Sequence, residues 1–257
     1  MSGMITQIYE VQTPEEAIQL IELGVDHIGS VIVSEDNWKV PPIKETIEKI
    51  RETDSKSSLI PLFKTHQSIF KVIDYYQPDV IHFCDVLSYH NPVYGNHQDL
   101  LELQQKIKVK FPQVRIMRSI PIAQTGNEKE VDTMKLAELF EPVSDFFLTD
   151  TLLTAKSSIS ADPQPVHGFI GITGRTCDWD IALELVNSSS IPVILAGGLS
   201  PDNVFAGIAH VRPAGVDSCT GTNAKDEKGN IIRFKKDFEK IKRFVKEIRS
   251  AEKHLIP

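Results

Sequence analysis

The sequence predicts a single (β/α)8 barrel domain over residues 1–257. Short apolar, β-branched segments alternate with amphipathic helical segments, which is the pattern of parallel βα units. Eight such apolar segments occur, and eight parallel strands close a barrel. The length of 257 residues and the hydrophobic content of 41% are enough for one large buried core.

The expected strands are residues 5–9, 26–33, 58–63, 79–84, 114–119, 145–150, 191–196 and 215–219. A doubly wound open sheet would show the same alternation of strands and helices. The Gly-x-Gly-x-x-Gly turn expected after the first strand of such a sheet is absent from this sequence. The barrel is therefore the preferred fold.

The segments between the strands carry helix signals. In "TPEEAIQLIELG", Thr13 suits an N-cap and Gly24 suits the end of the helix. Residues 233–250 form an expected amphipathic helix whose basic residues face solvent. Its apolar stripe comprises Phe234, Phe238, Ile241, Val245 and Ile248.

Composition excludes several classes of function. The formal net charge of −7 argues against a protein that binds nucleic acid through its phosphates. The first residues lack a basic and apolar secretion signal, and no apolar run reaches the ~20 residues of a membrane span. The three cysteines, at wide spacings, suit reduced thiols. We expect a cytoplasmic protein, monomeric or homodimeric, without a cofactor, metal ion, nucleic-acid partner or membrane partner.

Two glycine-containing turns predict an anion site. Gly197 and Gly198 end the seventh strand in "LAGGLSPDNV", and Thr220 and Gly221 follow the eighth strand. Glycine permits close approach to the backbone, and the N-terminus of the following helix attracts negative charge. These turns are where barrels of the ribulose-phosphate-binding type hold a phosphate. The stretch "GITGRTCDW" either adds Gly174 and Arg175 to this site or is a connection capped by Asp178.

The chain resembles the phosphoribosylanthranilate isomerase family, most closely from residue 145 onward. "LAGGLSPDNV" and "VRPAGVD" match in order the family patterns L-[AS]-G-G-L-x-P-x-N-V and V-R-P-x-x-V-D. The resemblance implies a barrel that holds a substrate phosphate in its last two strand-end loops. It also implies an Amadori rearrangement, which is an intramolecular aldose–ketose isomerisation in tryptophan biosynthesis.

The resemblance assigns the general acid but not the general base. The acid is Asp150, which stands in "FLTDT" at the end of the sixth strand. The family's base is a cysteine in K-I-C-G at the end of the first strand, where this chain has Tyr9 in place of the cysteine and Glu10 in place of the glycine. Tyrosine has an ordinary pKa of ~10 and is a weak base at neutral pH. Glu10 and a relocated thiol, Cys84, are the other candidates.

Further departures leave the substrate open. The family's arginine after the second strand is missing; Trp38 and Lys39 stand there, either to stack on another ring or to cover the barrel rim. Arg118 ends the fifth strand, where it is expected to contact phosphate or a carboxylate. His82, Cys84 and Asp85 are capable of metal binding, but no second cluster of ligands accompanies them.

Three hypotheses remain. The first is a phosphosugar isomerase, either the tryptophan-pathway enzyme with an altered base or a relative that acts on another phosphoribosyl compound. The second is a non-catalytic barrel that binds a phosphorylated metabolite. The third is a lyase that forms a Schiff base through Lys64 at the end of the third strand.

Overall fold

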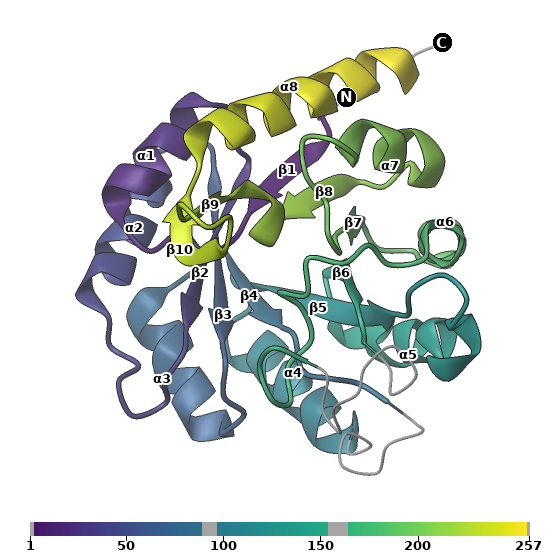
Figure 1. Cartoon of the computed structure of the whole chain (residues 1–257). Helices are drawn as coiled ribbons and strands as arrows, with labels where there is room; N and C mark the ends of the chain where they lie inside the picture. The colour runs from purple at the N-terminus through teal and green to yellow at the C-terminus, as the bar shows by residue number, and fades with distance from the viewer. Residues whose placement is uncertain (1–2, 89–96, 154–163, 256–257) are drawn as a thin grey trace.

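The computed structural model describes residues 3–88, 97–153 and 164–255 and contains a closed barrel of eight parallel strands in chain order. The predicted fold class is confirmed, because β1 pairs with both β2 and β8 (Figure 1). All eight strands lie where the sequence predicts them. Their bounds are β1 Ile5–Ile8, β2 His27–Ile32, β3 Lys56–Pro61, β4 Val80–Phe83, β5 Arg115–Ile122, β6 Phe146–Thr151, β7 Val193–Leu195 and β8 Gly215–Ser218.

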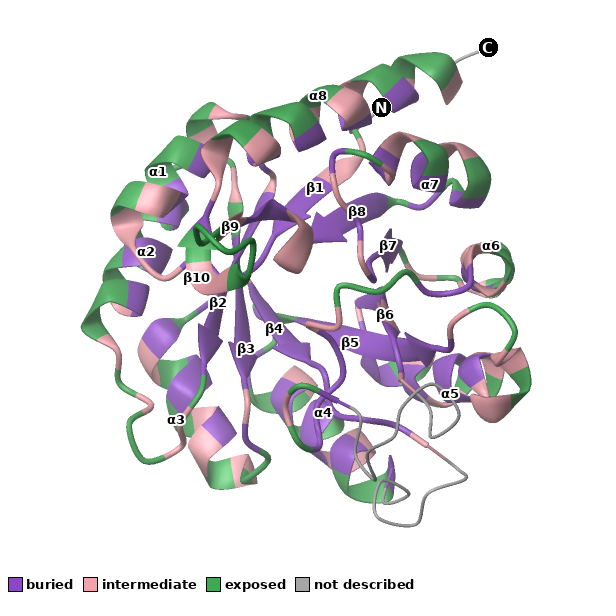
Figure 2. Cartoon of the chain, in the orientation of Figure 1, coloured by how far each residue is buried: buried purple, intermediate pink, exposed green. Residues whose placement is uncertain are grey.

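Helices surround the barrel with their apolar sides inward, and Figure 2 shows their outer faces exposed around the buried strands. The α-helices are α1 Pro14–Glu22, α2 Pro41–Arg51, α3 His66–Tyr76, α4 His97–Lys110, α5 Thr133–Phe140, α6 Trp179–Ser188, α7 Val204–Val211 and α8 Phe238–Leu255. Short 3-10 helices are η2 Glu128–Glu130, η3 Glu141–Val143 and η4 Thr220–Thr222. No helix in the described part of the chain is long and apolar enough to span a membrane.

The predicted cap of α1 is present, because the Thr13 side chain accepts a hydrogen bond from the N–H of Glu16. The prediction of a helix from residue 233 is wrong. Residues Asn223–Lys225 (β9) and Ile231–Lys236 (β10) form an antiparallel hairpin, which places Phe234 in a strand. The helix begins only at Phe238 because the Asp237 side chain accepts the N–H of Lys240, as an N-cap does.

Barrel closure determines which side chains reach the site. Successive side chains of a strand point to opposite faces, so every second residue faces the barrel interior. On β6, Leu148 and Asp150 face the interior, whereas Phe147 packs in the outer layer beneath α5. On β4, His82 and the following Cys84 face inward and Phe83 packs outward.

This alternation corrects the expectation that Arg118 contacts substrate. Its neighbours on β5, Met117 and Ser119, bond to groups inside the barrel, so Arg118 points outward beneath α4. The side chain is 0% exposed, and its guanidinium donates to Asp85 Oδ2 at 2.9 Å and to Gln104 Oε1 at 2.7 Å. Arg118 therefore has a structural place between the barrel and its helices.

Replacing Arg118 with Met should lower the free energy of unfolding by about 3–5 kcal/mol, because the buried carboxylate of Asp85 loses its main partner. Urea unfolding measures the change. The matched control is Arg243→Met, which breaks an exposed pair with Asp202 and should cost under about 1 kcal/mol. Equal losses in the two variants would contradict the buried ion pair as a stabilising contact.

Candidate active site

An apolar pocket opens at the carboxyl ends of the strands, where barrel enzymes carry their active sites. Its empty volume is about 530 Å³. Side chains from the ends of six strands, the connection before α6 and the β9–β10 hairpin form its walls. They are Tyr9, Glu10, Val31, Ile60, Leu62, His82, Cys84, Leu148, Asp150, Val166, Phe169, Ile170, Gly171, Ile172, Asp217, Cys219 and Arg233.

A smaller and more polar cavity, the glycine cradle, adjoins this pocket. The loops after β6, β7 and β8 line it. Its lining residues are Asp150, Ile172, Thr173, Gly174, Ala196, Gly197, Gly198, Leu199, Asp217, Ser218, Cys219 and Thr220. The structure therefore brings four of the residues predicted for phosphate binding together: Gly174, Gly197, Gly198 and Thr220.

Glycine is required in the cradle for backbone conformation and for space. Gly197 and Gly198 have φ angles of +90° and +61°, values that side chains rarely allow. A Cβ on Gly198 would lie 2.5 Å from the backbone of Arg175. At Gly221 a Cβ would lie 2.1 Å from the carbonyl oxygen of Leu199, so Gly221 shapes the loop without lining the cradle.

Two carboxyl groups, Asp150 on β6 and Asp217 on β8, line both the apolar pocket and the glycine cradle. Burial raises the pKa of Asp150 to about 7, against a smaller opposing effect of the N–H of Thr151. Burial also raises the pKa of Asp217, despite a hydrogen bond from Gln7 Nε2. The charge of Asp150 raises the pKa of Asp217 further, so the two groups interact.

Tyr9, which replaces the family's cysteine, lies at the floor of the pocket. Its ring packs directly on Gly29 of β2, where a Cβ would lie 2.0 Å away. Its hydroxyl bonds to Ser58 Oγ at 2.6 Å and to His82 Nδ1 at 2.7 Å. Burial raises the pKa of Tyr9 well above its ordinary value, more than the bond to Ser58 lowers it.

The other polar groups of the pocket floor are also held in one protonation state. His82 bonds through Nε2 to Ser119, and burial lowers its pKa to about 3. Burial raises the pKa of the Cys84 and Cys219 thiols, which favours their protonated forms. These residues line the pocket but are unsuited to accept a proton at neutral pH.

Glu10 occupies the family's glycine position with a φ angle of +64°, which is unfavourable for a side chain. Its carboxylate accepts hydrogen bonds from Asn223 Nδ2 at 2.7 Å and Arg233 Nε at 2.7 Å. Burial acts to raise the pKa of Glu10, but the bond from Asn223 and the charge of Arg233 lower it below its ordinary value. Glu10 is therefore an ionised group held by the hairpin.

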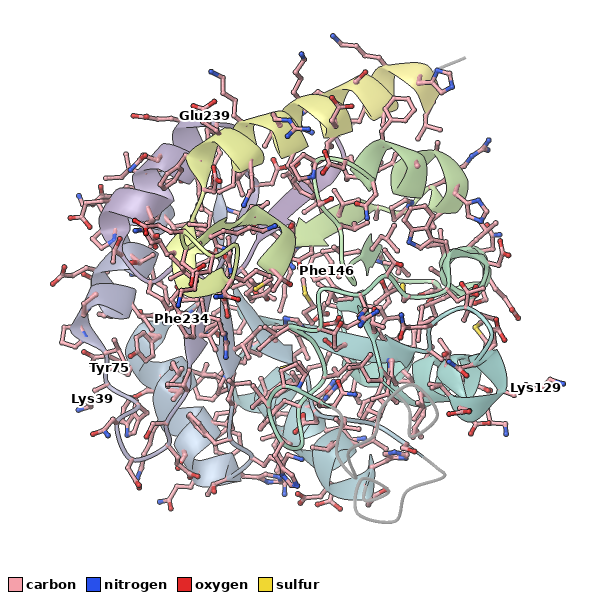
Figure 3. The ribbon with its side chains drawn as sticks, in the orientation of Figure 1. Lys39, Tyr75, Lys129, Phe146, Phe234 and Glu239 are labelled. Carbon is pink, nitrogen blue, oxygen red and sulfur yellow. The ribbon has the colours of Figure 1, made fainter. Side chains whose placement is uncertain are left out.

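Several predicted residues lie away from both cavities. Arg175 is exposed, and only its backbone takes part, with its carbonyl accepting from Thr151 Oγ1. Trp38 packs edge-on against Tyr75, and Lys39 lies over both rings at the outer edge of the molecule (Figure 3), which agrees with the rim interpretation. Asp178 caps α6.

Lys64 is 46% exposed and pairs with Asp85 Oδ1 at 3.5 Å, outside the lining of the apolar pocket. Asp85 itself is engaged by Arg118, not by His82 and Cys84. Within the described ranges, no group of three or more His, Cys, Asp or Glu side chains is arranged to hold a metal ion.

Sequence reasoning missed Asp217 and Arg233 as site residues. Asp217 stands in the family-like stretch "VRPAGVD" and follows the outward-facing Val216, so strand alternation would have placed it inside the barrel. Arg233 carried no comparable signal, because the interpretation of residues 233–250 as a helix hid the hairpin that brings it to the pocket.

Comparisons with known proteins point to one family. The sequence model of the N-(5'phosphoribosyl)anthranilate (PRA) isomerase family matches residues 101–247. The chain is 30% identical over 242 residues to N-(5'-phosphoribosyl)anthranilate isomerase of Methanothrix thermoacetophila, covering 90% of this chain and 91% of that protein.

Two solved structures share the fold. Generated monomers of the dimeric phosphoribosylanthranilate isomerase of Thermotoga maritima superpose with a TM-score of 0.66 at 21% identity, covering 96% of this chain and 99% of that chain. A phosphoribosyl anthranilate isomerase in complex with reduced 1-(o-carboxyphenylamino)-1-deoxyribulose 5-phosphate gives 0.65 at 20% identity, with the same coverage. Because the family model matches more than half of the chain and this relative is 30% identical over nine-tenths of it, the chain belongs to the N-(5'-phosphoribosyl)anthranilate isomerase family.

Proposed function

We propose that the protein catalyses an Amadori-type aldose–ketose isomerisation of a phosphorylated sugar derivative, with Asp150 and Asp217 as its acid–base pair. The observation that carries the proposal is that both carboxyl groups line both the apolar pocket and the glycine cradle. A substrate with its phosphate in the cradle and its apolar end in the pocket would place the reacting sugar carbons between these carboxyl groups. A relative that binds a reduced carboxyphenylamino-deoxyribulose 5-phosphate supports this substrate class.

The reaction needs one proton donor and one proton acceptor. The acid donates a proton to the ring oxygen as the C1–O bond breaks, and the nitrogen lone pair forms the C1=N bond. The base then removes the proton from C2, so that a C1=C2 bond forms and the electrons of the C1=N bond return to nitrogen. The resulting enol becomes the C2 ketone as its hydroxyl loses a proton and C1 gains one. Each group is most effective when its pKa lies near the working pH. Asp150 meets this condition through its burial.

Asp217 is the candidate base that the pocket supports best. Tyr9, Cys84 and Cys219 are held protonated, and both ring nitrogens of His82 are engaged. The carboxylate of Glu10 has a lowered pKa and is occupied by donors of the hairpin. Burial raises the pKa of Asp217 to about 8, against the opposing effects of the hydrogen bond from Gln7 and the charge of Lys236, so its carboxylate is basic enough to accept a proton near neutral pH. We therefore assign the acid to Asp150 and the base to Asp217.

A lyase mechanism through Lys64 receives less support. A Schiff base requires an unprotonated amine within reach of the substrate carbonyl. The Lys64 amine pairs with Asp85 and lies over the ring of Phe169, outside the lining of the pocket. A non-catalytic phosphometabolite-binding barrel is the alternative that the kinetic test below decides.

Asp150→Asn and Asp217→Asn should each lower kcat for freshly made phosphoribosylanthranilate by about 10²–10⁴-fold, as expected for loss of a general acid or base. Tyr9→Phe and Cys84→Ser should retain turnover within about tenfold, because neither group transfers a proton in this scheme. Stopped-flow fluorescence follows the reaction. Wild-type protein without turnover on this or related phosphoribosylamines would support the binding barrel instead.

The pH profile separates the two roles. The acid must be protonated, so kcat/KM should fall as the pH rises through the Asp150 pKa of about 7. The base must be ionised, so activity should also fall as the pH drops through the Asp217 pKa of about 8, which leaves a narrow maximum between the two. In Asp150→Asn the residual activity should lose the decline on the alkaline side and keep the decline on the acid side. The reverse result would exchange the two assignments.

A further inference from the structure

We propose that Gln7 is a positioning residue of the acid–base pair: its amide, held in one orientation by His27, directs the carboxyl group of Asp217 and sets its strength as the base. The inference rests on the proposed function, in which Asp217 removes the C2 proton. Gln7 and His27 are buried and line neither the apolar pocket nor the glycine cradle. Their effect on the reaction therefore passes through Asp217.

The three residues form a row across neighbouring strands. Gln7 on β1 is the register partner of His27 on β2 and of Asp217 on β8. Tyr9, two residues after Gln7 on the same strand end, lines the apolar pocket, so strand alternation directs Gln7 into the barrel as well. Gln7 is 0% exposed. The strand pairing that closes the barrel thus places the Gln7 amide between an imidazole and a carboxyl group.

The Gln7 amide has a partner for each of its polar groups. Nε2 donates to Asp217 Oδ1 at 3.2 Å and to Met117 Sδ at 3.8 Å, which uses both of its N–H groups. Oε1 lies 3.2 Å from His27 Nδ1. Because an amide oxygen can only accept, His27 Nδ1 carries the hydrogen. Turning the amide over would place its oxygen against the Asp217 carboxylate and leave the His27 N–H facing a donor, so one orientation is favoured.

His27 is neutral in the neutral pH range, which keeps this arrangement constant. Burial lowers its pKa to about 4, more than the neighbouring carboxylates raise it. Its ring packs edge-on against Phe146, with ring centres 5.8 Å apart, and Figure 3 labels Phe146 near the centre of the barrel. The charged groups that act on His27 are two carboxylates and two cations: Asp26, Asp79, Arg115 and Lys56.

The residue type at position 7 matters for the base. The family pattern K-I-C-G aligns with "QIYE" in this chain and has a lysine where Gln7 stands. An ammonium group in this row would stabilise the Asp217 carboxylate and lower its pKa. Gln7 gives only a neutral hydrogen bond, so burial raises the pKa of Asp217 to about 8 despite that bond. The first strand thus lacks both the family's lysine and its cysteine, and both changes favour Asp217 as the base.

Gln7 acts on Asp217 among several other groups. The hydrogen bond from Gln7 changes the pKa of Asp217 more than the charge of Asp150, which raises it, or the charge of Lys236, which lowers it. The other titratable groups that interact with Asp217 are Tyr9 and Cys219. A substitution at position 7 should therefore move the pKa of Asp217 while these groups stay in place.

Substitutions of Gln7 that act in opposite directions test the proposal on the full chain. Carbon-13 NMR of the aspartate carboxyl groups, assigned with Asp217→Asn, gives the pKa of Asp217. Gln7→Lys should lower this pKa by about 1–3, as an adjacent cation does. The acid-side decline of kcat/KM should move to lower pH with it, and kcat should fall because the base is weaker.

Gln7→Met removes the donor and keeps a side chain of similar length. It should raise the pKa of Asp217 by about 1–2, because the carboxylate loses a hydrogen bond, and move the acid-side decline of kcat/KM to higher pH. His27→Phe should shift this pKa in the same direction. Added to Gln7→Met, it should change the pKa no further, because His27 acts through Gln7.

Gln104→Met is the matched control for the loss of a buried amide. Gln104 is also 0% exposed and donates two hydrogen bonds, but it lies on α4, outside the barrel. Urea unfolding should show a loss of stability in this variant, as in Gln7→Met, while the pKa of Asp217 stays at its wild-type value. A purely structural role of Gln7 would likewise lower stability without opposite shifts in Gln7→Lys and Gln7→Met.

Three results would overturn the inference: an unmoved Asp217 pKa in Gln7→Met, shifts in the same direction in Gln7→Lys and Gln7→Met, or an equal shift in Gln104→Met. If Gln7→Lys prevents folding, Gln7→Met and His27→Phe decide the question. The expected shifts in a protein without turnover would refute the proposed function and leave the control of Asp217 by Gln7 standing. Turnover with an unmoved Asp217 pKa would do the reverse.

Discussion

Closure of eight parallel strands into a barrel is the constraint on which the site depends. Once β1 pairs with both β2 and β8, each strand must send alternate side chains inward, and the last inward residue of each strand reaches the same mouth. Asp150 and Asp217 reach the mouth by this rule, and Arg118 is excluded from it by the same rule. Whether a side chain reaches the pocket therefore depends on whether its position on the strand faces inward or outward.

Several strands together accommodate Tyr9, which stands in place of the family's cysteine. The ring of Tyr9 fits only because Gly29 lacks a side chain, and its hydroxyl is satisfied by Ser58 and His82. Burial that holds the phenol and thiols protonated also raises the pKa of the two aspartates towards neutrality. Burial therefore keeps the side chain at the replaced position protonated, and in the proposed mechanism it also brings the pKa of the two aspartates into the range needed for proton transfer.

The sequence alone predicted the barrel, the place of all eight strands and most of the glycine cradle, because these depend on local periodicity and on glycine at strand ends. It did not reveal the contact between Glu10 and Arg233. This contact joins positions more than two hundred residues apart and rests on a hairpin that the helical pattern of residues 233–250 concealed. The expectation for Arg118 was wrong because its position on β5 alternates with the inward-facing Met117 and Ser119, so its side chain points outward.

The proposed mechanism requires that, of Asp150 and Asp217, one carboxyl group is protonated and the other ionised in the neutral range. Carbon-13 NMR of the aspartate carboxyl groups as a function of pH, with Asp150→Asn and Asp217→Asn to assign the signals, tests it most directly. The account predicts that one carboxyl group of the pair stays protonated at pH 7, and that replacing either residue lowers the pKa of the other by removing a neighbouring charge. Two carboxyl groups that both ionise near the ordinary aspartate pKa of about 4 would contradict it.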